Sequence, residues 1–308
     1  MDSYSRQVLQ ALRLSRSPGW HFAGHFLGLS FDTLLPEGAV VSMPLEARHL
    51  DSQGKPVFAA LAVLSDVAAA AAIRGRVSAQ TRLATVTIRL SFSGASAAQR
   101  LCANSQYRFR TTDLAMPTAI TALSIHSQGE LLCTGEASFA VLDNRRGVAP
   151  HPMARDRRLD ATEPLSPDEL TEAETQVLQH ARRALASCRN DGIPFLQAFW
   201  DLQPTATGDL AECTMRSALH TRNRVGDIQG GVLLALAAHT SAAVTGPGWR
   251  LLDIAAQYLA AGSGPLTARA KAQRIGRNLA SISCTVIDEH GHPVLRSDTT
   301  LARQVSSN

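Results

Sequence analysis

The chain has 308 residues, a formal net charge of +4 and 45% hydrophobic residues. This composition is typical of a globular protein, and a charged fraction of 18% is too low for a disordered chain. The length is sufficient for two domains of ordinary size. Because the arginines are scattered rather than gathered in stripes with interleaved aromatic residues, the pattern favours an anionic small-molecule ligand over nucleic acid.

The cysteines and the apolar segments bear on the cell compartment. Five cysteines, an odd number without Cys-x-x-Cys spacing, indicate reduced thiols and a cytoplasmic protein. The first twenty residues have no basic start followed by an apolar run, so no signal peptide is predicted. The most apolar stretch, residues 56–73, is mostly alanine and contains Ser65 and Asp66. We therefore expect a buried core helix there and no membrane span.

In the first half of the chain, a strand is predicted at residues 39–45. A loop at residues 51–57 then leads into an alanine-rich helix. This helix is apolar around nearly its whole circumference, which indicates burial on all sides. Turn residues separate the strands that follow. These four strands are predicted at residues 83–93, 99–110, 119–126 and 131–142.

Residues 143–165 are rich in Arg, Asp and Pro and are typical of a linker. A helix is predicted at residues 166–188, where Ser166 and Glu169 have the spacing of a capping box. A strand at 210–217 and a second alanine-rich helix follow. The last four strands are predicted at residues 250–260, 266–275, 280–288 and 294–302.

The two halves are copies of one unit. Residues 51–59 align without a gap on residues 223–231, and in each half the order is strand, helix, then four strands. We therefore predict an α+β fold made of two tandem units. Its domains are predicted at residues 1–145 and 193–308, with a linker carrying one helix at residues 146–192.

About five antiparallel strands curled around one central helix form the hotdog fold, and the loop residues resemble those of the PaaI-like acyl-CoA thioesterases. Those enzymes carry an Asn-x5-His-Gly-Gly loop before the central helix and an acid nine residues after the histidine. In the second copy Asn223, Gly230 and Gly231 match this motif. Gln229 replaces the histidine and Ala238 replaces the acid. The resemblance covers most of both halves.

The first copy retains the opposite part of the motif, because Asp66 occupies the position of the acid. Its loop has lost the family's residues, which are replaced by Asp51, Val57, Phe58 and Ala59. In the family the site straddles two hotdog units, so the resemblance implies a pseudo-dimer within one chain. One junction would unite Asp66 with the second loop. The other would place Ala238 beside the first loop, without catalytic groups.

The chemistry of thioester hydrolysis gives each residue of the first junction an expected role. The Gly230 N–H at a helix start would stabilise the oxyanion. Burial should raise the pKa of Asp66, which suits either a general base or a direct nucleophile. Asn223 and Gln229 would supply neutral hydrogen bonds. Thr85 matches a position where related enzymes place a Ser or Thr that assists the acid.

The resemblance therefore implies a thioesterase that converts an acyl-CoA, or a related acyl thioester, into free acid and thiol, without a cofactor. A catalytically silent acyl-CoA-binding protein is a second reading, because Gln229 replaces the histidine and one junction is damaged. A hydratase or dehydratase is a third. That chemistry typically uses a Tyr-x-x-Asp-x-Asn-Pro-x-His loop, which the sequence lacks.

Several other residues have plainer expected roles. His239 lies next to the vacated acid position and is expected to be structural. His290 and His292 lie on a turn without metal-ligand spacing, so no metal is predicted. Further association into a homodimer stays open. Four arginines are candidates for the 3′-phosphate of CoA, namely Arg74, Arg76, Arg274 and Arg277.

Overall fold

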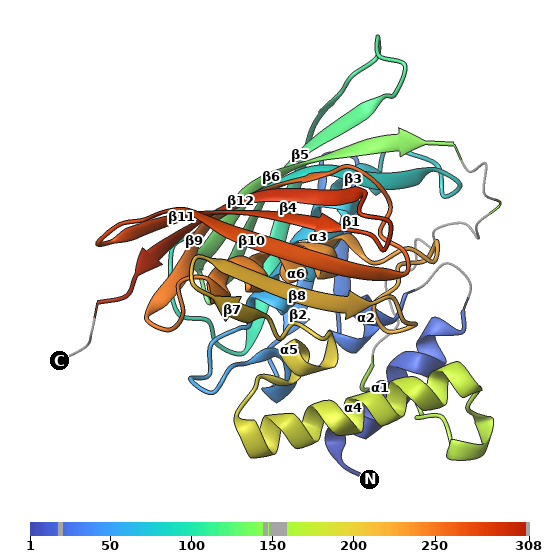
Figure 1. Ribbon diagram of the computed structural model, residues 1–308. Coiled ribbons are helices and arrows are strands. Elements are labelled where there is room, and N and C mark those ends of the chain that lie inside the picture. Colours follow the sequence, from blue (N-terminus) through green and yellow to red (C-terminus); the bar gives the residue numbers. More distant parts are fainter. Residues whose placement is uncertain (18–20, 144–146, 148–158, 306–308) are drawn as a thin grey trace.

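The computed structural model describes residues 1–17, 21–143, 147 and 159–305. It contains an antiparallel 12-stranded sheet in the order β1-β2-β4-β5-β6-β3-β9-β12-β11-β10-β8-β7. This sheet curls around two helices, α3 (Phe58–Arg74) and α6 (Gly230–Ala243), as Figure 1 shows. The predicted arrangement, a sheet wrapped around a central helix in each half, is confirmed.

Apart from the two 3-10 helices, the other elements repeat in the same order in both halves. The first half contains α1 (Ser3–Ser15), α2 (Phe22–Phe26), β1 (Ser30–Leu35), β2 (Gly38–Pro44), the 3-10 helix η1 (Ala47–His49), β3 (Arg82–Phe92), β4 (Arg100–Arg110), β5 (Thr118–Ser127) and β6 (Glu130–Leu142). The second half contains the 3-10 helix η2 (Pro167–Glu169), α4 (Glu172–Asp191), α5 (Phe195–Phe199), β7 (Thr205–Thr207), β8 (Leu210–Arg216), β9 (Trp249–Tyr258), β10 (Pro265–Ile275), β11 (Leu279–Ile287) and β12 (Pro293–Arg303).

The duplication extends to the register of the strands. β4 and β10 have the same succession of buried and exposed residues. A bulge interrupts the β3–β6 pairing between Thr85 and Thr87, and a matching bulge interrupts the β9–β12 pairing between Leu251 and Asp253. The halves join where β3 pairs antiparallel with β9, with Leu90 opposite Ile254. One sheet therefore runs through the whole molecule.

All ten strands predicted from the sequence are present, with ends within two residues of the prediction. Alternation of buried and partly buried residues, which is complete along β5, made them visible. The short edge strands β1 and β7 and the helices α1, α2 and α5 were not predicted. Edge strands pair on one side only and carry a weaker pattern, which β7 illustrates because all of its residues are exposed.

The helix predicted at residues 166–188 begins later than expected. Ser166 and Glu169 do form a capping box, but this box caps the short 3-10 helix η2 and not α4. Thr171 and Glu174 form a second box, and α4 starts after it. In the second half α4 takes the place in the element order that α1 has in the first. The domain limits at residues 145 and 192 stay a prediction, and residues 146 and 148–158 of the predicted linker lie outside the described residues.

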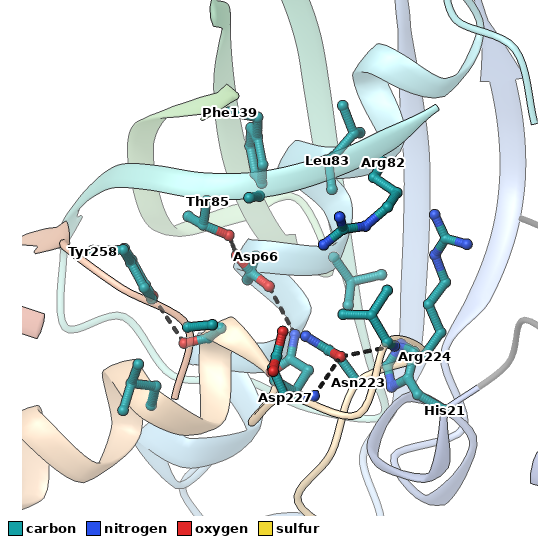
Figure 2. A pocket seen from close by; sticks show the side chains of 18 of the residues that line it. His21, Asp66, Arg82, Leu83, Thr85, Phe139, Asn223, Arg224, Asp227 and Tyr258 are labelled. Atoms are coloured by element: carbon teal, nitrogen blue, oxygen red, sulfur yellow. Dashed lines mark hydrogen bonds between the residues drawn. The ribbon is translucent and has the colours of Figure 1, made fainter. Parts of the chain in front are cut away.

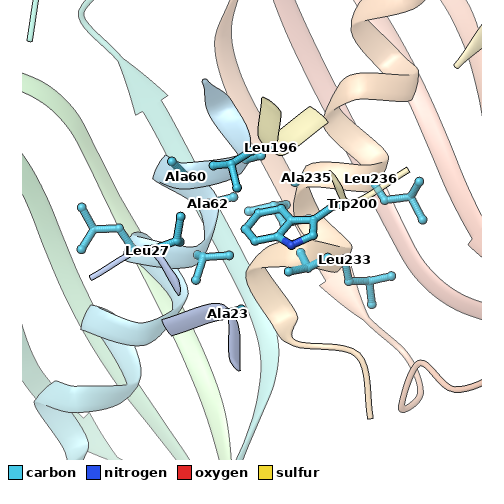
Figure 3. Packing of buried hydrophobic residues seen from close by; sticks show 14 of the residues in the cluster. Ala23, Leu27, Ala60, Ala62, Leu196, Trp200, Leu233, Ala235 and Leu236 are labelled. Carbon is cyan, nitrogen blue, oxygen red and sulfur yellow. The ribbon is translucent and has the colours of Figure 1, made fainter. Parts of the chain in front are cut away.

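The two central helices contact each other because small residues line their crossing. A Cβ added to Gly231 of α6 would lie 2.4 Å from Val63 Cα and 2.5 Å from the Ala62 carbonyl oxygen of α3. Figure 3 shows the buried indole of Trp200 between the two helices. The position of the α6 N-terminus relative to α3 therefore depends on a glycine at 231.

We expect Gly231→Ala to lower the free energy of unfolding by about 1–3 kcal/mol, because the added methyl group meets backbone atoms that cannot rotate away. Gly230→Ala is the matched control. Its methyl group meets the Asp66 side chain, which can move, so the loss should be smaller. Denaturant unfolding of both variants measures the difference. A Gly231→Ala variant as stable as the parent would contradict this account of the crossing.

Candidate active site

Asp66 and the second loop come together across the two halves. Asp66 lies in the middle of α3 and is 7% exposed. Gln229, at the N-terminus of α6, donates a hydrogen bond from Nε2 to Asp66 Oδ2 at 2.7 Å. A Cβ on Gly230 would lie only 2.9 Å from each carboxylate oxygen. The predicted convergence of Asp66 with Gln229 and Gly230 is therefore present.

Further groups orient the carboxylate. Thr85 of β3 donates from Oγ1 to Asp66 Oδ1 at 2.8 Å, and the Gly231 backbone N–H contributes another hydrogen bond. Gln229 is itself oriented, because its Oε1 accepts from the Val232 N–H at 2.9 Å and so caps α6. Its Nε2 must then face Asp66. Donors from both halves thus hold one buried carboxylate.

Burial raises the pKa of Asp66 from 3.8 to about 6. The hydrogen bonds from Thr85, Gly231 and Gln229 act in the opposite direction because they favour the charged form. Burial is the larger effect. A carboxyl group with a pKa near 6 is ionised at neutral pH, yet it is a stronger base than an exposed carboxylate, which suits proton transfer.

The N-terminus of α6 offers a backbone donor next to this carboxylate. The Val232 and Leu233 N–H groups bond to Gln229, whereas the Gly230 N–H has no acceptor among the described residues. The helix dipole adds positive potential at this end. The Gly230 N–H is therefore available to a ligand oxygen.

Tyr258 is a site residue that was not predicted from the sequence. Its hydroxyl donates to the Gly230 carbonyl oxygen at 2.8 Å, and the same peptide unit carries the Gly231 N–H that bonds to Asp66. Burial, together with the charge of Asp66, raises the pKa of Tyr258 well above 10, so it stays a donor. Aligned hydrogen bonds polarise one another. Its position at the end of β9 gave no sequence signal.

Asn223 holds the loop in shape. Its Oδ1 accepts from the Val225 and Asp227 N–H groups at 2.9 and 3.2 Å (Figure 2). Asp51 bonds its own loop in the same manner in the first half. An aspartate can replace the asparagine there because only the side-chain oxygen is used. Asn223 also lines the cavity described next, and a direct part for it in the reaction stays a prediction.

A cavity of about 520 Å³ opens beside Asp66. Part of its wall is apolar and includes Leu83, Met116, Phe139 and Leu142. Another part is basic and consists of Arg74, Arg82 and Arg224. Of the four arginines proposed for a CoA phosphate, Arg74 alone lines this cavity.

The remaining three arginine candidates lie elsewhere. Arg76 stacks on the Tyr107 ring, with its guanidinium carbon 4.4 Å from the ring centre, and bonds to the Pro36 carbonyl oxygen. Arg274 and Arg277 belong to the β10–β11 hairpin.

The second junction carries apolar residues at the equivalent positions. Ala238 takes the place of Asp66 and Phe58 that of Gly230. By the register of the matching bulges, Leu251 corresponds to Thr85 and Phe92 to Tyr258. The rings of Phe58 and Phe92 pack edge to face, with centres 5.7 Å apart. Aromatic packing therefore stands where the first junction has polar groups.

His239, His290 and His292 lie outside this cavity. Burial lowers the pKa of His239 to about 4, so it is neutral. His290 and His292 lie on the β11–β12 turn, and His292 does have a carboxylate neighbour, Asp288, at 3.3 Å. No group of three or more His, Cys, Asp or Glu in the described ranges is arranged to bind a metal ion. None of the described helices is long and apolar enough to cross a membrane.

Solved structures resemble this chain over nearly its whole length. The tesB protein of Mycobacterium avium subspecies paratuberculosis is 13% identical, with a TM-score of 0.54 over 91% of this chain and 96% of that one. The acyl-CoA thioesterase II TesB2 of Mycobacterium marinum is 15% identical, with a TM-score of 0.51 over 92% and 97%. A hot dog fold protein of unknown function from Alicyclobacillus acidocaldarius is 13% identical, with a TM-score of 0.54 over 90% and 96%.

At these identities the likeness concerns the fold, and it confirms the predicted fold class. The chain is an α+β protein made of two hotdog units. No protein-family model matches the sequence, and no curated protein matches it either.

The raised pKa of Asp66 makes stability depend on pH. The folded chain binds a proton at Asp66 more tightly than the unfolded chain does. Protonation of Asp66 therefore stabilises the fold fully below pH 3.8, and this stabilisation is lost as the pH rises through 6. Relative to Asp66→Asn, the parent should therefore lose up to about 3 kcal/mol between pH 4 and pH 7. Chemical denaturation across this range measures the loss. Asp113→Asn, at an exposed position, controls for the removal of one charge.

A stability difference between the parent and Asp66→Asn that does not change with pH would contradict the raised pKa.

A buried carboxyl group should also make stability depend on pH at the second junction. Ala238 is buried among apolar groups. Ala238→Asp should therefore lower the free energy of unfolding by about 3 kcal/mol or more at pH 8, and by less at pH 4, where the new carboxyl group is protonated. Thermal unfolding at the two pH values tests this, and equal stability of variant and parent at pH 8 would refute it.

Proposed function

We propose that this chain hydrolyses an acyl-CoA thioester to the free acid and CoA, at one composite site per chain. The observation that carries the proposal is the buried Asp66 carboxylate, which donors from both halves hold next to an available Gly230 N–H and a cavity. The fold shared with a protein named as an acyl-CoA thioesterase supports it. The loop motif and Asp66 support a relation to the PaaI-like enzymes within the hotdog thioesterases.

The proposed chemistry uses these groups in order. The thioester carbonyl oxygen accepts from the Gly230 N–H, which stabilises the negative charge that develops there. The oxygen of a water molecule attacks the carbonyl carbon while its proton passes to Asp66. The carbon–sulfur bond then breaks, and Asp66 returns the proton to the leaving sulfur. Thr85 and Gln229 keep the carboxylate aligned throughout.

A direct attack by Asp66 on the thioester is the second route to the same products. The carboxylate attacks the carbonyl carbon, the carbon–sulfur bond breaks and the thiolate leaves, which gives an anhydride. Water then hydrolyses the anhydride, so that the free acid and the Asp66 carboxylate are restored and the thiolate takes up the proton that water releases. Both routes require the ionised carboxylate, so both give activity that rises as the pH passes the pKa of Asp66. We also propose a cytoplasmic location, supported by free thiols at all five cysteines.

Release of free thiol from a panel of acyl-CoAs tests the activity. We expect Asp66→Asn to lower kcat by roughly 10² to 10⁴ fold, the range of a lost general base. The parent should gain activity as the pH rises through about 6. Thr85→Val removes a hydrogen bond that favours the carboxylate, so this rise should move to higher pH. Thr87→Val, two residues along the same strand, is the control.

Two results would count against this function. Hydrolysis that persists in Asp66→Asn would exclude the proposed site. CoA binding without thiol release from any acyl-CoA would instead identify a catalytically silent binding protein. Measurement of thiol release by the purified parent protein, together with a calorimetric titration of that protein with CoA, separates these two cases.

A further inference from the structure

Arg74 is a buried cation that the proposed reaction does not use. It lies two helical turns after Asp66 on α3, is 6% exposed, and lines the same cavity. One guanidinium nitrogen donates to the Thr81 carbonyl oxygen at 2.8 Å. Burial and the nearby charge of Arg224 lower the pKa of Arg74 to about 9, which shows how poorly the cation is compensated. A buried charge without an opposite charge is costly.

Arg82, the first residue of β3, brings a second cation to this wall. Its Nε is buried and has no hydrogen-bond partner. In Figure 2 its side chain points into the pocket on the side of Asp66. Within the described ranges neither Arg74 nor Arg82 forms an ion pair with a carboxylate. Each therefore has donor capacity directed at the cavity.

The surroundings of these arginines add positive charge. Arg224 lies close to Arg82, whose charge contributes to lowering the pKa of Arg224. His21 lines the same region but stays neutral, because burial and Arg224 lower its pKa to about 4. The carboxylates along the described cavity wall are Asp66, whose oxygens already accept from Thr85 and Gln229, and Asp227.

We propose that Arg74 and Arg82 form a subsite for an anionic oxygen group of the substrate, separate from the reacting carbonyl. The inference deepens the proposed function, because it makes the substrate a thioester with a negative charge at a set distance from the thioester. Guanidinium groups suit carboxylate and phosphate oxygens because their N–H groups match pairs of acceptors. An anion there would neutralise charges that otherwise repel one another.

The same chemistry can come from two parts of a substrate. One is a carboxylate at the far end of the acyl group, and the other is a phosphate of CoA. Eight residues along a helix place the Arg74 and Asp66 Cα atoms about 12 Å apart. The experiment therefore separates the two parts chemically.

Hydrolysis is measured with four thioesters. Hexanoyl and adipoyl thioesters of N-acetylcysteamine differ only in a terminal carboxylate and carry no phosphate. Hexanoyl-CoA and hexanoyl-pantetheine differ only in the phosphorylated nucleotide. In one of the two pairs, we expect the charged thioester to have a kcat/KM higher than that of its uncharged counterpart by on the order of 10- to 100-fold. This is the range of a charge-assisted hydrogen bond. Arg74→Gln and Arg82→Gln should each reduce that preference.

The pair that shows the preference identifies the source of the anion. Arg269→Gln is the control, because Arg269 is exposed, pairs with Glu212 and lies outside the cavity. Arg82→Gln guards against a misfolded Arg74→Gln, since Arg82 is only half-buried. A preference that survives both substitutions would overturn the proposal, as would the absence of any preference.

A binding measurement separates this inference from the proposed reaction. CoA and adipate are titrated calorimetrically into Asp66→Asn and into the double variants that add Arg74→Gln or Arg82→Gln. We expect at least one of the two probes to bind and to lose affinity on removal of either arginine, even if the parent hydrolyses nothing. Unchanged affinity in both double variants, or no binding of either probe, would refute the subsite.

Discussion

The burial of one carboxylate is the constraint on which the site depends. Asp66 lies in an apolar helix and is only 7% exposed, so it loses most of its hydration and the charged carboxylate needs donors from its neighbours. The first half supplies Thr85 from β3. The second supplies Gln229, whose other end caps α6, and the backbone at Gly231. The carboxylate, the helix start and the crossing of the two central helices therefore form one connected arrangement.

This arrangement needs two dissimilar surfaces, and a duplicated chain supplies them. One copy holds the acid and the other holds the helix start with its glycines. At the second junction the equivalent positions hold Ala238, Leu251, Phe58 and Phe92. Apolar packing there removes the cost of a second buried charge. Two loops that keep the same turn, held by Asp51 and Asn223, preserve the duplicated backbone although the side chains around them have diverged.

Much of the fold was predictable because the strands alternate and the copies can be aligned. The pairing of Asp66 with the second loop followed from the position of each residue in the motif. Tyr258 and Arg82 escaped prediction because they reach the cavity from strand ends, and sheet register, not sequence spacing, decides which strand ends meet. The start of α4 was misplaced because Ser166 and Thr171 both carry a glutamate three residues later.

The pairing of β3 with β9 has a consequence for how the site assembles. A site shared by two separate chains exists only at concentrations where the chains associate, and dilution would dismantle it. Here the partner surface is part of the same polypeptide, so its effective concentration does not change with the amount of protein. The Asp66 site therefore forms when one molecule folds. At a given concentration of free substrate, the fraction of sites that are occupied should not depend on the protein concentration.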